Sequence, residues 1–523
     1  MSGWHQHIVI VPVVLPLMTG AVMLLLDERR YGVKGALSVL STLVLVAVAI
    51  VLVRLVDLPS VQVYRLGGWE APFGIVLVGD RLSAALVLLT AVLGLAAVVF
   101  SIARWHRAGP RFHSLLQFLL MGVNGAFLTG DLFNLFVFFE VFLAASYGLA
   151  LHGSGTPRVR ASLHYVVINL TASLLFLIGA TLLYGVTGTL NLADLAVRAP
   201  AIVGGNRALL EAGAAILGIA FLVKAGMWPL GFWLPGTYGA ASAPAAALFA
   251  VLTKVGLYSV LRTWLLLFGN EPSSPAFGSA WLVLGGLATL TFGFVGVLAS
   301  QDLARMASYS LLVSSGTLLA AIGLDEVAIT AAALYYLIAS TLGVSAFFLL
   351  IELVERGRRP GAALLAVTAE AFGEGDGDGE PQEDAGIAIP ATIALLGISF
   401  ACCALAIAGL PPLPGFVAKF ALMDALLGVG SLSAASWALL ALLIVSGLAA
   451  VVAIGRAGVN VFWAEGMTNV PRVRVIEMGP VVLLLMLSGA LTVQAGPAME
   501  YLTRAAQFLH ARTGYIDAVM TRP

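Results

Sequence analysis

Residues 224–232 read Lys-Ala-Gly-Met-Trp-Pro-Leu-Gly-Phe, and residues 409–419 read Gly-Leu-Pro-Pro-Leu-Pro-Gly-Phe-Val-Ala-Lys. Both segments lie inside long apolar stretches and carry helix-breaking residues next to a lysine. Proline removes a backbone donor and collides with the preceding helical turn, so each segment predicts a broken helix. The residues expected to make the breaks are Gly226, Pro229, Pro411, Pro412 and Pro414.

The composition around these segments is that of a membrane protein. Hydrophobic residues make up 60% of the 523 residues and charged residues only 10%, with a mean hydropathy of +1.01. Soluble domains carry roughly 25% charged residues, so a fully soluble protein is excluded. A net charge of zero gives no electrostatic reason to expect a nucleic-acid partner. We expect a multi-pass protein of the bacterial inner membrane.

Apolar runs of about 20 residues, the length that crosses a bilayer, recur along almost the whole chain. Helices are expected because backbone groups in lipid must be satisfied within the segment. The alternating pattern of a transmembrane barrel is absent. The predicted fold class is therefore an all-α integral membrane protein with about 14 transmembrane helices, at 7–26, 33–53, 80–100, 113–130, 132–151, 163–184, 208–232, 243–268, 279–298, 304–323, 327–352, 388–427, 434–455 and 476–497.

The two breaks lie in the seventh and the twelfth run, five helices apart. A five-helix unit crosses the membrane an odd number of times, so a second copy is inverted. Interrupted helices at corresponding positions of two such units indicate an ion site near the membrane midplane. We predict inverted repeats of helices 4–8 and 9–13. The expected regions are 1–110 with helices 1–3, 111–270 with the first repeat, 271–460 with the second repeat and a flexible loop at 353–387, and 461–523 with helix 14 and the tail.

The distribution of basic residues separates the lysines from the arginines. With both termini outside, 15 basic residues fall on the inside and 9 on the outside, in keeping with the positive-inside rule. The remaining three, Lys224, Lys254 and Lys419, lie inside apolar runs. Every arginine is expected at a helix end or in a loop.

Buried lysines at this depth indicate proton transport. A charge near the bilayer centre costs at least about 2.5–3.5 kcal/mol, so such residues should face the bundle interior and have a partner. Burial can lower the proton affinity of a lysine, whereas arginine stays charged. Glu140, the only acidic residue near the middle of a run, is the expected partner of Lys224. The alternative is that the lysines form fixed ion pairs or extend toward the membrane surface.

Cofactor chemistry is not expected. No phosphate loop, dinucleotide fingerprint or haem-ligand pattern is visible in the sequence. The two cysteines, Cys402 and Cys403, are adjacent and cannot form a metal site by themselves. We expect no cofactor, and the sequence leaves the position of a sodium site open.

Several segments resemble the antiporter-like subunits shared by respiratory complex I and the Mrp sodium/proton antiporters, and are most similar to the MrpD family. The resemblance covers nearly the whole chain and implies a proton-translocating component of a multisubunit Na⁺/H⁺ antiporter, with other Mrp-type membrane subunits as partners. The segments are Thr129-Gly-Asp-Leu-Phe-Asn-Leu-Phe-Val-Phe-Phe-Glu140, Tyr165-Val-Val-Ile-Asn169, Val186-Thr-Gly-Thr-Leu-Asn-Leu-Ala-Asp194, Leu252-Thr-Lys-Val-Gly-Leu-Tyr258 and Gly409-Leu-Pro-Pro-Leu.

The resemblance also implies residue roles. Glu140 and Lys224 would pair between helices 5 and 7, Lys254 would be the lateral relay, and Lys419 would lead to the other side. Helix 11 departs from the family, because Ala339 stands where a histidine is typical. A relay step there would need water or Thr341. Two alternative functions are a proton-pumping antiporter-like subunit of a respiratory NADH- or hydrogenase-type complex, and a scaffold that only assembles a complex.

Overall fold

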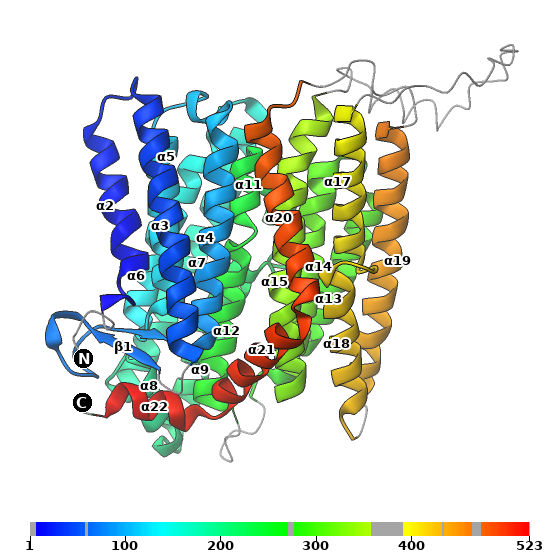
Figure 1. Ribbon diagram of the computed structural model, residues 1–523. Coiled ribbons are helices and arrows are strands. Elements are labelled where there is room, and N and C mark those ends of the chain that lie inside the picture. The colour runs from blue at the N-terminus through cyan, green and yellow to red at the C-terminus, as the bar shows by residue number, and fades with distance from the viewer. Residues whose placement is uncertain are drawn as a thin grey trace, which may run out of the picture.

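A computed structural model of the chain describes residues 7–57, 61–269, 277–356, 391–430, 433–462 and 472–521. Most of the described helices run side by side as one bundle (Figure 1). Twelve of them are long and apolar enough to cross a membrane, and the shorter apolar helices Val11–Leu25 and Phe112–Leu128 stand among them. Each of the predicted apolar runs contains at least one helix. The expected all-α membrane fold is therefore confirmed.

The helices follow the predicted runs in order. The first half of the bundle contains α2 (Val11–Leu25), α3 (Tyr31–Asp57), α4 (Arg81–Ile102), α5 (Phe112–Leu128), α6 (Leu132–Ala150), α7 (Thr156–Thr187), α9 (Gly205–Ala225), α10 (Trp233–Ala240), α11 (Ala243–Phe249) and α12 (Leu252–Phe268). The second half contains α13 (Ser279–Ala299), α14 (Leu303–Gly323), α15 (Val327–Glu355), α17 (Ala391–Ala408), α18 (Pro414–Gly428), α19 (Ala434–Phe462) and α20 (Val475–Val493). The loop predicted at 353–387 lies outside the described residues, except for its start, which still belongs to α15.

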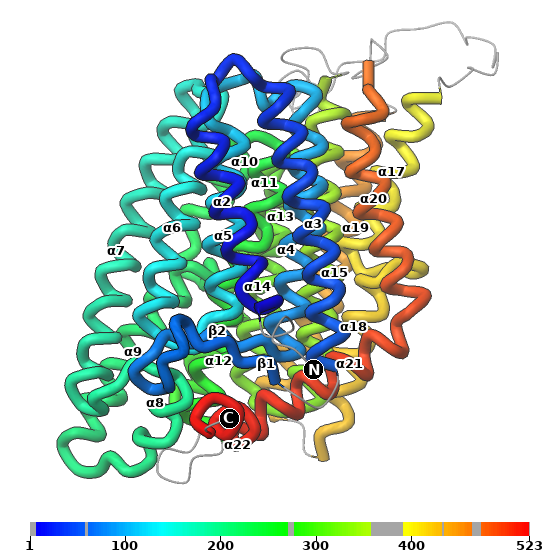
Figure 2. Tube along the Cα trace, turned by 60° about the vertical axis from the view of Figure 1, so that its left-hand side comes forward, coloured from blue at the N-terminus to red at the C-terminus, as the bar shows by residue number. Residues whose placement is uncertain are grey.

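Short elements cover one end of the bundle, which we call the terminal face because both chain termini lie there (Figures 1 and 2). An antiparallel hairpin pairs β1 (Gln62–Arg65) with β2 (Val76–Gly79). Beside it lie α8 (Leu192–Arg198), α21 (Ala495–His510) and α22 (Arg512–Met520). The predicted apolar runs did not include these elements, because they lie at the end of the bundle rather than across it.

Both repeats begin their second helix in the same way. The Asp131 side chain accepts a hydrogen bond from the Asn134 backbone N–H at the start of α6, 2.9 Å away. The Asp302 side chain accepts one from the Ala304 N–H at the start of α14, 3.0 Å away. An aspartate at this position satisfies a backbone donor that has no partner within the helix. Both helices therefore start from an aspartate cap.

The two broken helices have matching geometry. After α9 ends, Gly226 adopts a φ of 77°, and after α17 ends, Gly409 adopts a φ of 78°. This left-handed backbone strongly favours glycine and closes the helix end. The chain resumes as α10 and α18. In Figure 1, α9 starts near the terminal face, whereas α17 starts at the opposite face, so the two broken helices run in opposite directions.

A third interruption, which the sequence did not predict, lies in the eighth run. The chain leaves α11 after Phe249 and enters α12 at Leu252, with the turn residues Ala250 and Val251 between them. The Lys254 backbone N–H donates to the Val251 carbonyl across this turn, at 3.0 Å. Lys224, Lys254 and Lys419 are therefore all within a few residues of an interrupted helix.

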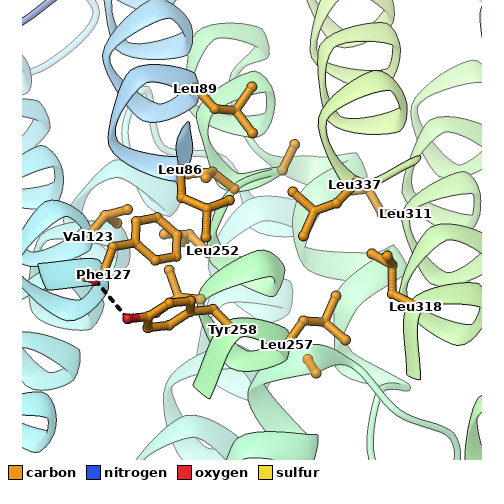
Figure 3. Close-up of a cluster of buried hydrophobic side chains, with 14 of the residues drawn as sticks. Leu86, Leu89, Val123, Phe127, Leu252, Leu257, Tyr258, Leu311, Leu318 and Leu337 are labelled. Atoms are coloured by element: carbon orange, nitrogen blue, oxygen red, sulfur yellow. Dashed lines mark hydrogen bonds between the residues drawn. The ribbon is translucent and has the colours of Figure 1, made fainter. Parts of the chain in front are cut away.

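The centre of the bundle is a continuous apolar core around α15. Figure 3 shows part of it, where Leu86 of α4, Leu257 of α12 and Leu337 of α15 point toward one another. The Tyr258 hydroxyl in this cluster donates to the Phe127 carbonyl, at 2.8 Å. Burying the one polar atom of Tyr258 is tolerated because it is hydrogen-bonded. This core fixes the helices that carry the lysines.

Candidate functional site

Lys254 is the start of a buried chain of polar groups. Its side chain is 0% exposed, and its Nζ donates to the Ser314 Oγ of α14 at 2.7 Å. Ser314 Oγ in turn lies 2.9 Å from the Ser340 Oγ of α15. Hydroxyl groups donate and accept at the same oxygen, so the chain can pass a proton from one end to the other. Three helices, α12, α14 and α15, contribute one group each.

In the eleventh predicted helix, which is α15 in the structure, the polar chain continues through Ser340 and not through Thr341. The Thr341 Oγ1 donates to the Leu337 carbonyl of its own helix, at 2.6 Å. Ser340, one position earlier, faces Ser314 instead. The side chains of adjacent helical residues point about 100° apart, so only one of the two can face α14. Thr341 therefore does not extend the chain from Lys254 in this structure.

A small cavity begins where this chain ends. It has a volume of about 20 Å³ for the centres of water molecules. A single water needs about 10–15 Å³ on this measure, so the cavity has room for at least one. Its lining includes the hydroxyl-bearing residues Ser310, Tyr336, Ser340 and Ser446. The lining also includes Gly415 of α18, so the cavity connects the Ser340 end of the chain with the second helix break.

Lys419 lies beside that break on α18. It is 6% exposed, and its Nζ donates to the Ala408 carbonyl at 2.9 Å. Ala408 is the last residue of α17, where carbonyl groups have no partner within the helix and carry partial negative charge. Although Lys419 follows its break in the sequence, its ammonium group reaches back across it.

Lys224 lies in the last turn of α9, immediately before the first break. It is 5% exposed, and its Nζ lies 4.9 Å from the centre of the Phe139 ring. Within the described part of the chain, this Nζ has no hydrogen-bond partner. An ammonium group over an aromatic face is attracted to it, but that contact leaves its hydrogen-bonding capacity unused. Lys224 is therefore held loosely compared with the other two lysines.

Glu140 lies one residue after Phe139 on α6, but it does not contact Lys224 directly. Its Oε1 accepts a hydrogen bond from the Ser173 hydroxyl of α7. Among the described residues, no ion pair within 4.0 Å includes Glu140. The arrangement is a separated pair, with Phe139 lying against the lysine and Ser173 bound to the carboxylate.

The helices of Lys224 and Lys254 approach one another closely. A Cβ added at Gly256 of α12 would lie 2.6 Å from the Ala225 backbone nitrogen. Only glycine permits such an approach of two backbones. The contact is next to Lys224 and two residues from Lys254. It brings the separated pair and the serine chain into one region of the bundle.

One buried arginine does not follow the predicted distribution. Arg262 lies within α12, 3% exposed, so the expectation that every arginine sits at a helix end or in a loop is wrong here. It forms an ion pair with Asp80, which is 2% exposed. The Arg262 guanidinium also lies 5.3 Å from the Tyr258 ring centre and 5.2 Å from that of Tyr515 in α22. A buried arginine is tolerated when an acidic partner neutralises it.

Sequence reasoning missed three serines that extend the polar contacts of the charged residues. One contacts Glu140, one contacts Lys254, and the third contacts the serine on Lys254. Ser173, Ser314 and Ser340 are common residues in apolar helices, and serine in a helix usually bonds to its own backbone. A signal existed for Ser340 alone, because it stands beside the position where a family histidine is absent. The others required the packing of α6 on α7 and of α12 on α14.

Substituting Ser340 with alanine should slow proton-coupled exchange, because it removes the last hydroxyl before the cavity. Losing one hydrogen bond of about 0.5–1.5 kcal/mol corresponds to a two- to tenfold slower step. Rates would be measured in vesicles at equal amounts of assembled complex. Thr341→Val is the control, since its hydroxyl bonds only to its own helix. Equal slowing by both variants would argue against the serine chain.

Comparison with known proteins gives matches over the full length of the chain. Residues 129–448 match the family described as "NADH:quinone oxidoreductase/Mrp antiporter, TM". A Rhizobium meliloti protein, named as the D subunit of a probable K⁺/H⁺ antiporter, is 55% identical over 100% of this chain and 99% of its own length. The D subunit of a Na⁺/H⁺ antiporter from Bacillus subtilis is 34% identical over 98% of this chain and 99% of its own.

Solved structures share the same fold. A chain in the Mrp complex from Dietzia sp. DQ12-45-1b superposes with a TM-score of 0.84 at 26% identity, covering 99% of this chain and 100% of that one. A chain of respiratory complex I from Thermus thermophilus superposes with a TM-score of 0.76 at 24% identity, covering 97% and 99%. The second likeness is one of fold alone.

Proposed function

Because the chain belongs to the D-subunit family of Mrp antiporters, within the wider NADH:quinone oxidoreductase/Mrp antiporter family, we propose that it carries protons through its buried lysines in a multisubunit monovalent cation/proton antiporter. The chain is an antiporter subunit, a transporter rather than an enzyme. The respiratory alternative is disfavoured, because the relatives at 55% and 34% identity are both named as antiporter subunits.

The observation that supports this proposal most directly is the continuous polar route beginning at Lys254. A proton leaving the Lys254 ammonium is accepted by Ser314 as Ser314 releases its own proton to Ser340. Ser340 in turn releases its own hydroxyl proton to a water molecule in the adjoining cavity, which carries it toward Lys419. The neutral Lys254 then receives a new proton from Lys224, because α9, which carries Lys224, packs against α12, which carries Lys254.

In this mechanism Glu140 controls the recharging of Lys254. A carboxylate close to a lysine favours the ammonium form of that lysine. When the carboxylate moves away or is neutralised, burial favours the uncharged lysine, and Lys224 releases its proton. The separated geometry suits this role, because a direct buried ion pair would hold the proton in place more strongly.

The exchanged cation is proposed from the relatives. The sequence resemblance implied sodium, and the Bacillus subtilis relative at 34% identity is named for Na⁺. The relative at 55% identity is named for K⁺. We therefore favour potassium as the cation and the cell membrane as the location, with other Mrp subunits as partners.

Potassium should drive proton release from vesicles at lower concentration than sodium. The measurement is the recovery of a pH-sensitive dye after addition of each chloride salt to vesicles that contain the whole complex. Choline chloride controls for ionic strength. A response to sodium alone would restore the sodium expectation without affecting the proton route.

The proposed mechanism is tested most directly by Glu140→Ala and Lys224→Ala in the whole complex. Exchange is compared with wild type at matched amounts of assembled complex. We expect exchange to be lost in both variants, because one removes the controlling charge and the other the proton carrier. Exchange retained in both would show that the chain only assembles the complex.

A further inference from the structure

A large apolar cleft lies between the two repeats, away from the serine chain. It has a volume of about 480 Å³ and is formed by α9, α12 and α13. Ligand sites in proteins usually have volumes of about 300–1,000 Å³, so this cleft is large enough for a specific occupant. Its lining has no charged residue among the described residues. The hydroxyl of Thr263 on the lining donates to the Ser259 carbonyl of its own helix, at 2.6 Å.

The cleft opens on the lipid-facing side of the bundle. Ile219 and Trp281 on its lining are 42% and 77% exposed, and both belong to candidate membrane spans. Aromatic residues gather where α12 ends and α13 begins. The Trp264 and Phe277 rings stack with their centres 5.5 Å apart. Aromatic residues of this kind mark the membrane–water interface, so the cleft starts at headgroup depth.

The length of the cleft corresponds to one leaflet. Its lining on α9 runs from Ala214 to Leu222, eight residues on, or about 12 Å at the rise of an α-helix. Half of a bilayer core of about 30 Å is about 15 Å. A hydrocarbon chain that enters the cleft at its aromatic end therefore reaches the membrane middle.

The inner end of the cleft touches the first helix break. Leu222 and Met227, on either side of Lys224, both line it. On α13, Thr289 Oγ1 accepts a hydrogen bond from the Trp228 backbone N–H at 2.8 Å, which holds the break against the second repeat. Whatever fills the cleft therefore packs directly against the segment that positions Lys224.

We propose that this cleft binds one acyl chain of a phospholipid from the leaflet on the terminal face, as a fixed component of the protein. The uncharged lining, the lipid-facing opening, the aromatic rim and the leaflet depth all match a hydrocarbon chain. A polar ligand would leave its hydrogen-bonding groups unpaired in this lining. The bound chain keeps water from the break on this side and supports Leu222 and Met227. This inference does not depend on the proposed proton route.

The test is a substitution that fills the cleft. Gly218 lines the cleft, and a Cβ added there would meet no atom within 4 Å, so the side chain of Gly218→Phe can leave the backbone freely and occupy the cleft. Gly185→Phe is the matched control, because Gly185 on α7 is equally open. Native mass spectrometry of the purified whole complex would count the retained phospholipids. We expect one fewer in Gly218→Phe and no change in Gly185→Phe.

A second readout places the acyl chain within the cleft. The whole complex is reconstituted with phospholipid whose acyl chains are brominated close to the headgroup, at the depth of Trp264, and the fluorescence of Trp264 is obtained by subtracting that of a Trp264→Phe variant. Quenching of Trp264 in wild type, relieved by Gly218→Phe alone, would support the proposal. Unquenched Trp264 in wild type would overturn it. Equal quenching in wild type and Gly218→Phe would also overturn it.

Discussion

Replacing Lys254 by methionine should reduce cation/proton exchange to background while the complex still assembles. Lys254 is fully buried, and its Nζ is the only charged group in the chain that runs through Ser314 to Ser340. Methionine has a similar length and no proton to give. Removing a lone buried charge also removes its desolvation cost, so folding should not suffer. Exchange would be measured in vesicles that contain the whole complex.

Two further substitutions separate a proton carrier from a fixed charge. Lys254→Arg keeps the positive charge but cannot release a proton, so it should inactivate exchange as completely as methionine does. Lys34→Met is the matched control, since Lys34 is equally buried but pairs with Glu28 at 3.0 Å, away from the route. Normal exchange in Lys254→Arg would show that the charge alone matters, contrary to the proposed relay.

Replacing Arg262 by leucine should destabilise the protein by about 3–5 kcal/mol, because it leaves the Asp80 carboxylate buried without its cation. The same change removes a cation held between the Tyr258 and Tyr515 rings. The expected result is a lower unfolding temperature of the purified complex and less complex in the membrane. Leucine itself is tolerated in the apolar surroundings of α12.

A double variant tests whether the unpaired charge causes this loss. Asp80→Asn removes the negative charge and keeps a side chain that can cap α4, where Asp80 now accepts a hydrogen bond from the Ser83 N–H at 2.9 Å. Combining it with Arg262→Leu should recover most of the lost stability, since neither charge is left alone. Exchange per assembled complex should stay close to wild type. A large loss of exchange would instead place this ion pair in the transport route.

The lysines and helix breaks could be predicted because their signals are local. A lysine inside an apolar run is costly wherever the helix packs, so its position alone indicates function. Proline close to a glycine interrupts a helix whatever surrounds it, and the matching sequences that begin at Gly226 and Gly409 predicted equivalent breaks. The interruption before Lys254 carried no such residue within it, and only the packed structure revealed it.

The contacts of these residues could not be predicted. Glu140 and Lys224 were expected to pair because opposite charges in lipid attract. In the structure, the Glu140 carboxylate accepts a hydrogen bond from Ser173, and the Lys224 ammonium lies over the Phe139 ring. Thr341 was considered for the step on helix 11, whereas Ser340 faces Ser314. A change of one position rotates a side chain by about 100°, and only the packing of the helix decides which face points inward.

The sequence by itself determined that this chain is a bundle of membrane helices, where those helices lie, and that Lys224, Lys254 and Lys419 are buried among them. These follow from hydropathy, helix breakers and the cost of charge in lipid, which act within a single segment. Only the tertiary structure decided the partners of those residues: the Lys254–Ser314–Ser340 chain, the Arg262–Asp80 pair and the cleft beside Leu222. Each joins helices far apart in the chain, and their relative rotation and spacing are set by packing that no single segment encodes.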